Sequence, residues 1–273
     1  MEDLFNHPVF QGGVAPFAAG LVVALALLWT RLSGLAVVAS FVTAVYLISG
    51  LTFEPLTATR KIVLLGCAAP AAGLLLDFAF EPKRFSTALV AIASGAASVW
   101  VFWSILTQKE LAEALLLGGV TSVFVAAVTA IGLSLAREPV RASTAGLTLG
   151  LAVGISAMLG ASALYALYGI ALGAGAGAFL LLQMVLGRRI FAGATLTLPA
   201  ALTSGLLAAG AMIQATLPWY ALPALVFVPV AALVPLPEKM PIWQQAFLRS
   251  GCAMMAAGIA FTLTWRFAGN AIT

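Results

Sequence analysis

One acidic residue stands inside an apolar stretch of this chain. Asp77 lies within the run LLLDFAF at residues 74–80. A carboxylate at membrane depth is costly, and it commonly marks an ion or proton pathway beside a charged partner. Arg249 is the partner that the expected helix order allows, so Asp77 is a candidate for proton coupling or gating. The alternative is that Asp77 belongs to the loop of Glu81 and Arg84 and lies at headgroup level.

Two prolines interrupt apolar helices at corresponding places. Pro70 and Pro199 each remove a backbone hydrogen bond in mid-span, and the freed carbonyl groups need another partner. Broken helices at matching positions of two halves are typical of transporter substrate sites. Hydroxyl groups flank the second proline: Thr195, Thr197, Thr203 and Ser204. We therefore place the candidate substrate site at these two prolines, together with Thr195 and Thr197; an ordinary proline kink is the alternative.

The residues that enzymes and metal sites need are almost missing. His7 is the only histidine, so no histidine-based metal cluster or catalytic dyad can form within the chain. No nucleophile elbow, phosphate-binding glycine loop or acidic metal motif is present. Cys67 and Cys252 fall in separate apolar runs and are interpreted as small packing residues rather than a disulfide. We expect no enzymatic activity, metal or cofactor.

Composition places the chain in a lipid bilayer. Apolar residues make up 63% of it, and the mean hydropathy is +1.11. Charged residues fall in short clusters between apolar runs of about 17–22 residues, which are long enough to span a hydrocarbon core of roughly 30 Å. The pI near 9.4 reflects cations spread along loops, so we expect no nucleic-acid partner. The expected fold class is all-α: a polytopic helical membrane protein in contact with lipid.

The charged clusters divide the sequence into about ten transmembrane helices. These cover residues 14–30, 33–51, 62–80, 85–106, 114–135, 144–163, 167–187, 191–213, 217–234 and 246–266. Two boundaries carry no charge, and one of them, Gln214–Trp219, has only a proline and an aromatic residue to mark it. The other lies within residues 143–187, which are about twice as long as one crossing needs, so the chain must turn near 162–169. We expect Tyr165 and Tyr168 to lie at headgroup level there. Nine helices are the alternative count.

Lysine and arginine predict the orientation, because cytoplasmic loops carry most of them. With the N-terminus outside, nine cations lie inside: Arg31, Lys83, Arg84, Arg137, Arg141, Arg188, Arg189, Lys239 and Arg249. Four lie outside: Arg60, Lys61, Lys109 and Arg266. The sequence therefore predicts an integral membrane protein with both termini outside. Its alanine- and glycine-rich composition and short loops suggest a bacterial cytoplasmic (inner) membrane.

The two halves of the chain resemble each other weakly. Similar residues recur at an offset of about 130 positions, which corresponds to five helices: Pro8 and Pro139, Arg60 and Arg188, Pro70 and Pro199, Glu113 and Gln245. Because five is odd, the halves 1–136 and 137–273 would have opposite orientations, as in inverted-repeat transporters. A chain rich in alanine, leucine and glycine also matches itself by chance, and residues 85–106 do not resemble 217–234.

Glycines recur at every fourth position in two of the expected helices. Gly146, Gly150 and Gly154 form one such series, and Gly173 and Gly177 form the other. Small residues with this spacing make a smooth face along which two helix backbones approach closely. We interpret both series as helix-packing faces. The alternative is a substrate path between sliding helices.

The leading functional hypothesis is a secondary transporter or permease with its site between two inverted five-helix repeats. Few charges come near the membrane interior, so a small neutral, amphipathic or lipid-like solute fits better than a highly charged one. The alternative is a non-catalytic integral-membrane subunit or scaffold of a larger complex; a homo-oligomer is compatible with either. A transporter should keep polar groups where helices 62–80 and 191–213 meet, whereas a scaffold should be packed shut there.

Overall fold

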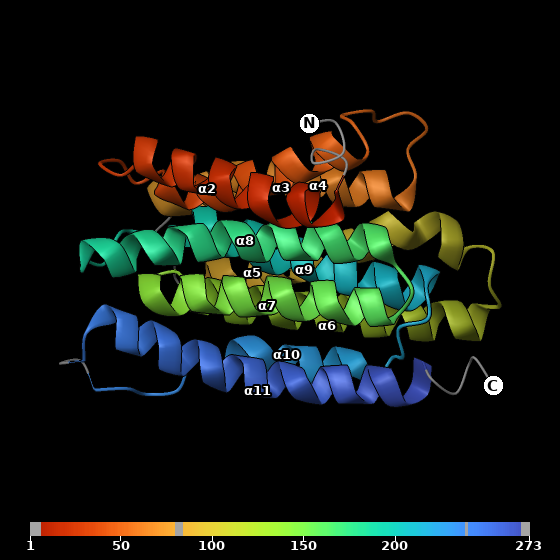
Figure 1. The fold of residues 1–273 in the computed structure, drawn as a ribbon. Coiled ribbons are helices and arrows are strands. Elements are labelled where there is room, and N and C mark those ends of the chain that lie inside the picture. The colour runs from red at the N-terminus through yellow and green to blue at the C-terminus, as the bar shows by residue number, and fades with distance from the viewer. Residues whose placement is uncertain (1–6, 80–83, 238–239, 269–273) are drawn as a thin grey trace.

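A computed structural model of the chain describes residues 7–79, 84–237 and 240–268. The described elements are helices that run along one common axis (Figure 1). In chain order they are η1 (Phe10–Val14), α2 (Ala15–Ala26), η2 (Ser33–Leu35), α3 (Ala36–Ile48), α4 (Ala58–Phe78), α5 (Arg84–Leu106), α6 (Leu111–Ser134), α7 (Pro139–Leu159), α8 (Ala163–Leu186), α9 (Gly193–Gln214), α10 (Ala221–Ala231) and α11 (Ile242–Ala268). The prediction of an all-α fold with ten helices is confirmed.

Seven of these helices are long and apolar enough to cross a membrane: α4, α5, α6, α7, α8, α9 and α11. The helical stretches Phe10–Ala26, Ser33–Ile48 and Ala221–Ala231 are apolar but shorter. The chain is therefore an integral membrane protein with seven candidate membrane spans. Ten membrane-spanning helices were expected, and seven of the described helices are long enough to span a membrane.

Helix α10 departs most from its expected length. The apolar run 217–234 predicts a full crossing, but the helix has 11 residues, or about 16 Å, roughly half of a hydrocarbon core. Pro218 precedes the helix and Pro235 follows it, and a proline cannot donate the backbone hydrogen bond that continues a helix. The prolines thus shorten an element that hydropathy alone predicts to be long.

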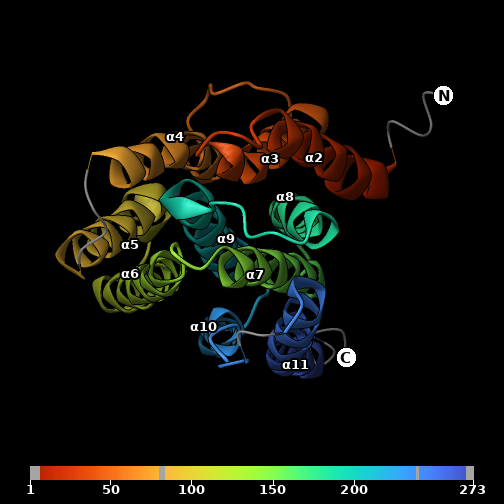
Figure 2. The same cartoon turned by 90° about the vertical axis from the view of Figure 1, so that its left-hand side faces the viewer.

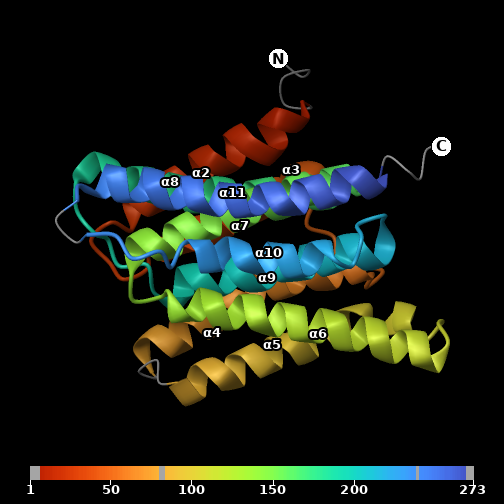
Figure 3. The same cartoon turned by 90° about the horizontal axis from the view of Figure 1, so that it is seen from below.

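Helix α9 occupies the centre of the bundle. Seen end-on, it lies between α4 on one side and α7 and α10 on the other (Figure 2). In the third view, α4, α5 and α6 lie together along one edge of the protein (Figure 3). Of the most apolar stretch of α9, 89% is buried by protein, against 28% for α11. Lipid therefore contacts α11 extensively and α9 hardly at all.

The backbones of α7 and α8 touch through their glycines. A Cβ added to Gly150 would lie 2.4 Å from the backbone nitrogen of Gly173, and one added to Gly169 would lie 2.7 Å from that of Gly154. Neither space admits any side chain. The series also continues outward along both helices, where Gly146 faces the Cβ of Ala176 and Gly177 faces Leu147.

Candidate functional site

Asp77 at the end of α4 binds the beginning of α9. Its Oδ1 accepts a hydrogen bond of 2.7 Å from the backbone N–H of Ala194, and its Oδ2 accepts one of 2.9 Å from that of Thr195. The Thr195 hydroxyl donates a third, of 2.6 Å, to Oδ2. The first N–H groups of a helix have no partner within the helix, and the helix dipole favours a negative charge there. Asp77 therefore caps α9 from another helix.

Gly193 makes room for this carboxylate. Its φ of +65° is a backbone conformation that glycine adopts without strain. A Cβ at this position would also lie 2.3 Å from Oδ2 of Asp77. The residue before the capped N–H groups must therefore be glycine for both a conformational and a steric reason.

Arg249 has different partners from those that the sequence suggested. The structure does not form the Asp77–Arg249 ion pair: the guanidinium of Arg249 donates a hydrogen bond of 3.0 Å to the side-chain oxygen of Gln245. Both oxygens of Asp77 are used by α9 instead. A helix N-terminus offers several fixed donors to a carboxylate, which explains the preference. The alternative interpretation depends on Glu81 and the Arg84 side chain, which lie outside the described part of the structure.

The two prolines lie at a closed contact between α4 and α9. Pro70 and Pro199 are both buried, and each helix continues through its proline. A Cβ at Gly73 of α4 would lie 2.8 Å from the carbonyl oxygen of Ala194. Beside Thr197, the space that extends toward α10 holds only about 10 Å³, the room of a single water molecule. That space lies on the side of α9 away from α4, whereas the contacts of Gly66 with Thr203 and of Gly73 with Ala194 pack α4 directly against α9 on either side of the prolines.

Four buried hydroxyl groups have no hydrogen-bond partner among the described residues, and two of them lie midway along α9. They belong to Thr129, Ser156, Thr203 and Ser204. Other buried hydroxyls on these helices bond to a carbonyl one turn earlier, as those of Thr144 and Thr148 do. Buried polar groups are normally satisfied, so this exception needs an explanation. The flanks of Pro199 pointed to Thr203 and Ser204 in advance; the position of Ser156 gave no signal in the sequence.

At the opposite end from Asp77, two tyrosines link four helices. The Tyr165 hydroxyl lies 3.0 Å from the Thr59 hydroxyl and accepts a 2.7 Å hydrogen bond from Gln214. The Tyr168 hydroxyl lies 2.7 Å from that of Ser49. The chain turns between α7 and α8 as expected, and both tyrosines lie buried in the first two turns of α8. Their place at headgroup level stays a prediction. Their hydroxyls find protein partners there, as a buried tyrosine requires. A polar pocket of about 300 Å³ adjoins Tyr168.

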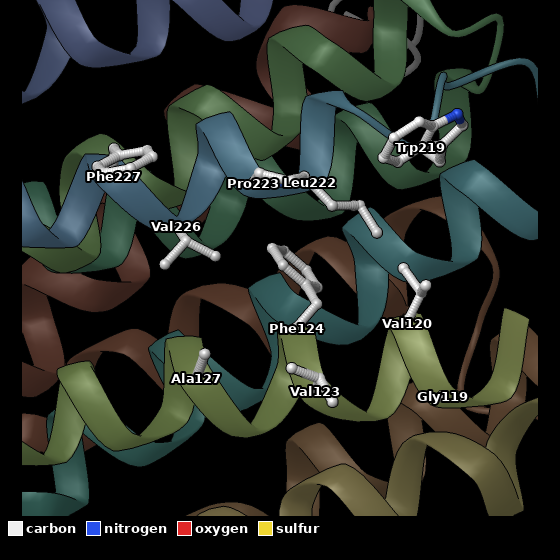
Figure 4. A pocket seen from close by; sticks show the side chains of 10 residues that line it. All are labelled: Gly119, Val120, Val123, Phe124, Ala127, Trp219, Leu222, Pro223, Val226 and Phe227. Carbon is white, nitrogen blue, oxygen red and sulfur yellow. The ribbon is translucent and has the colours of Figure 1, made fainter. Parts of the chain in front are cut away.

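An apolar groove separates α6 from α10. It has a volume of about 510 Å³, and its walls are Gly119, Val120, Val123, Phe124, Ala127, Trp219, Leu222, Pro223, Val226 and Phe227 (Figure 4). Val123 and Phe227 are strongly exposed at its rim. Because lipid surrounds this part of the molecule, the groove can take an acyl chain or an apolar part of another molecule.

No protein-family model matches this chain, and no curated protein matches it significantly. Within the described ranges, no group of three histidine, cysteine, aspartate or glutamate side chains could hold a metal ion. Function must therefore be inferred from three features: a capped and tightly packed α4–α9 contact, two unpartnered hydroxyls midway along α9, and a pocket at each end of the bundle.

Proposed function

We propose that the protein is a secondary transporter or permease for a small neutral, amphipathic or lipid-like solute. The observation that carries this proposal is the pair of hydroxyls on the central helix, those of Thr203 and Ser204, that have no partner among the described residues. They lie midway along α9, between the polar pocket near Tyr168 and the polar pocket near Arg249. The proposed route joins these two pockets along α9.

Unpartnered hydroxyls at this depth have a physical cost. Burying a hydroxyl without a hydrogen bond costs about 1–3 kcal/mol in proteins. The cost is recovered if water or a solute hydroxyl reaches these groups in another conformation. We therefore assign the structure to an occluded state, in which the path is closed around Thr203 and Ser204.

The helix contacts suit such a movement. In the α7–α8 contact, glycines of one helix lie against glycines of the other. At Gly73, α4 likewise touches the backbone of α9 with no side chain between them. Contacts of this kind contain few interlocked side chains, so neighbouring helices can shift with little repacking. The hydrogen bonds from the start of α9 to Asp77, which we call the tether, join α9 to α4. If α9 moves relative to α4, these hydrogen bonds must break or Asp77 must move with α9.

The same proposal includes two inverted halves, residues 1–136 and 137–273. Helices α4 and α9, which hold the corresponding Pro70 and Pro199, pack against each other, an arrangement compatible with a pseudo-two-fold axis that passes between them. The unequal lengths of α5 and α10 count against strict symmetry. Both termini outside and a bacterial inner membrane complete the proposal, with support from the lysine and arginine distribution alone.

The second candidate is a non-catalytic membrane subunit of a larger complex. The closed α4–α9 contact favours it, because a scaffold has no need for a path. The apolar groove between α6 and α10 could receive a helix or lipid-like group of a partner (Figure 4). The two candidates differ in whether water ever reaches the centre of α9.

Cysteine labelling separates the two candidates. Ser204→Cys would be introduced after Cys67 and Cys252, both free thiols, have been replaced by alanine. A membrane-impermeant thiol reagent would then be added to either side of proteoliposomes. We expect Ser204→Cys to react from both sides, because a transporter exposes its central site alternately.

Thr148→Cys on α7 is the matched control. Its hydroxyl is equally buried but already donates a 2.8 Å hydrogen bond to the Thr144 carbonyl, so this position should stay unlabelled. If Ser204→Cys is as unreactive as Thr148→Cys from both sides, the transporter proposal is wrong. Co-purification of a stable partner would then support the subunit.

A further inference from the structure

Three arginines surround a polar pocket at the end of the bundle that holds Asp77. The pocket has a volume of about 480 Å³ and is lined by Glu138, Pro139, Val140, Arg141, Arg189, Pro235, Leu236, Gln245 and Arg249. These residues come from the start of α7, the loop before α9, the loop after α10 and the start of α11. Positions far apart in the sequence thus create one concentration of charge.

Arg249 is the most unusual member of this group. Only 4% of the residue is exposed, and its single hydrogen bond to a described residue is the one to Gln245. Its buried Nε has no partner in the described structure. A guanidinium carries five N–H donors and is always charged, so most of its hydrogen-bonding capacity is unused here. A buried charge in a membrane bundle normally has a counterion.

Among the described residues, the charged side chains that line the pocket carry more positive than negative charge. Arg141 forms an ion pair with Glu138, but the buried Nε of Arg141 also has no partner among the described residues. Arg189 lines the same pocket, and its charge and those of Arg141 and Glu138 all act on Arg249. Three guanidinium groups thus face one carboxylate among the described residues. An anion that accepts several hydrogen bonds would remove this imbalance.

We propose that this pocket binds a phosphate group, either of an anionic lipid headgroup or of a free phosphate ion. Arginine forks pair with phosphate oxygens in bidentate geometry, which a halide cannot offer, and a phosphate group has more acceptor oxygens for several arginines than a single carboxylate has. The lysine and arginine bias places this end of the bundle in the cytoplasm, where basic pockets between membrane helices bind lipid headgroups. A small buried apolar cluster of Val140, Leu180 and Ala246 packs beside the pocket and supports its wall. The site does not depend on the proposed transport.

Two binding measurements on purified protein test the proposal. In the first, inorganic phosphate is titrated into detergent-solubilised protein in phosphate-free buffer, and binding is followed by calorimetry. In the second, native mass spectrometry counts phosphatidylglycerol retained from nanodiscs that also contain phosphatidylcholine. Retention of phosphatidylglycerol alone identifies a lipid headgroup, and a response to phosphate alone identifies the free ion; either result supports the site.

Neighbouring arginines provide the matched variants. Arg189→Gln should weaken binding about tenfold, because a charge-assisted hydrogen bond is lost. Arg188→Gln removes the same charge one residue away, where the guanidinium stacks on Trp29 outside the pocket, and should change binding less than twofold. Arg249→Gln should abolish binding, with its thermal unfolding measured to verify folding. Equal losses in the Arg188 and Arg189 variants, or no binding of either ligand to the wild type, would overturn the proposal.

Discussion

The α4–α9 and α6–α10 contacts are built from different kinds of residue and have opposite character. Between α4 and α9 the facing groups are small: Gly73 lies against the backbone of Ala194 and Thr195. Between α6 and α10 they are large: Phe124 and Phe227 line a groove of about 510 Å³ (Figure 4). The site expected from the sequence lies at the closed contact, whereas the open space lies at the other.

This difference follows from how helices approach in a membrane. Small residues let two backbones come within van der Waals distance, and dispersion and polar contacts then stabilise the pair. Bulky side chains hold the helices apart, and lipid can fill the remaining groove at little cost because it is as apolar as the side chains. In this protein, the tightly packed contact lies at the central helix α9, and the loosely packed one lies at the lipid-facing surface.

Among the variants that should still fold, the largest effect is expected from a matched pair of glycine substitutions. Gly73→Ala places a Cβ 2.8 Å from backbone atoms of α9 that cannot move aside, so it should lower the free energy of unfolding by about 1–3 kcal/mol. Gly119→Ala at the groove meets nothing within 4 Å and should change it by about 0.5 kcal/mol or less. Thermal unfolding in detergent measures both. Equal sensitivity at the two positions would contradict the distinction between the contacts.

A medium effect is expected at the tether between α4 and α9. Asp77→Ala leaves the N–H groups of Ala194 and Thr195 without an acceptor and should cost about 1–2 kcal/mol, the usual value of a lost helix cap. Asp77→Asn keeps one acceptor oxygen and should cost less. The unfolding midpoints of both variants test this order.

Glu113→Ala is the control for removal of a carboxylate. Its ion pair with Lys109 is exposed, so its loss should be close to neutral. The Asp77→Asn variant also tests proton coupling. The two substitutions Asp77→Asn and Ser204→Cys are combined in one protein. If this double variant folds like the wild type but its cysteine is not labelled, Asp77 has a role in gating beyond that of a helix cap.

The smallest effect is expected from filling the groove. Ala127→Phe adds an aromatic ring where lipid or an apolar ligand now fits, so the unfolding midpoint should hardly change. Ala201→Phe on α9 is the matched substitution at a packed site, where the Ala201 Cβ would already lie 2.7 Å from a Cβ built on Gly132. This variant should fail to yield folded protein in size-exclusion chromatography. Tolerance of the second ring would show that the centre of the bundle is looser than the structure indicates.

Much of the fold could be predicted because it depends on local free energies. The number of helices follows from apolar runs between charged clusters, since each run must satisfy its backbone hydrogen bonds internally in lipid. The four-residue spacing of Gly150 and Gly154 likewise corresponds to a face of α7 that touches α8. The length of α10 could not be predicted from hydropathy, because the flanking prolines do not lower the apolar content of the run.

The candidate site was predictable only in part. Pro70 and Pro199 do lie at one contact, and Asp77 does bind a second helix. Its partner is the N-terminus of α9 rather than Arg249, because backbone donors give no sequence signal. Thr195 joins the site through its hydrogen bond to Asp77, whereas Thr197 bonds within its own helix.

By itself, the sequence determined that the chain is a helical membrane protein and roughly where along the chain its helices lie, although many of their ends differ by four or five residues. The tertiary structure decided which faces meet: Asp77 with Ala194, 117 positions apart, and Arg141 with Arg189 and Arg249 around one pocket. The physical reason is that lipid is as apolar as the protein interior. A helix in this bundle therefore shows no polar side to mark its outer face, and only the packing of backbones and the pairing of a few polar groups select its neighbours.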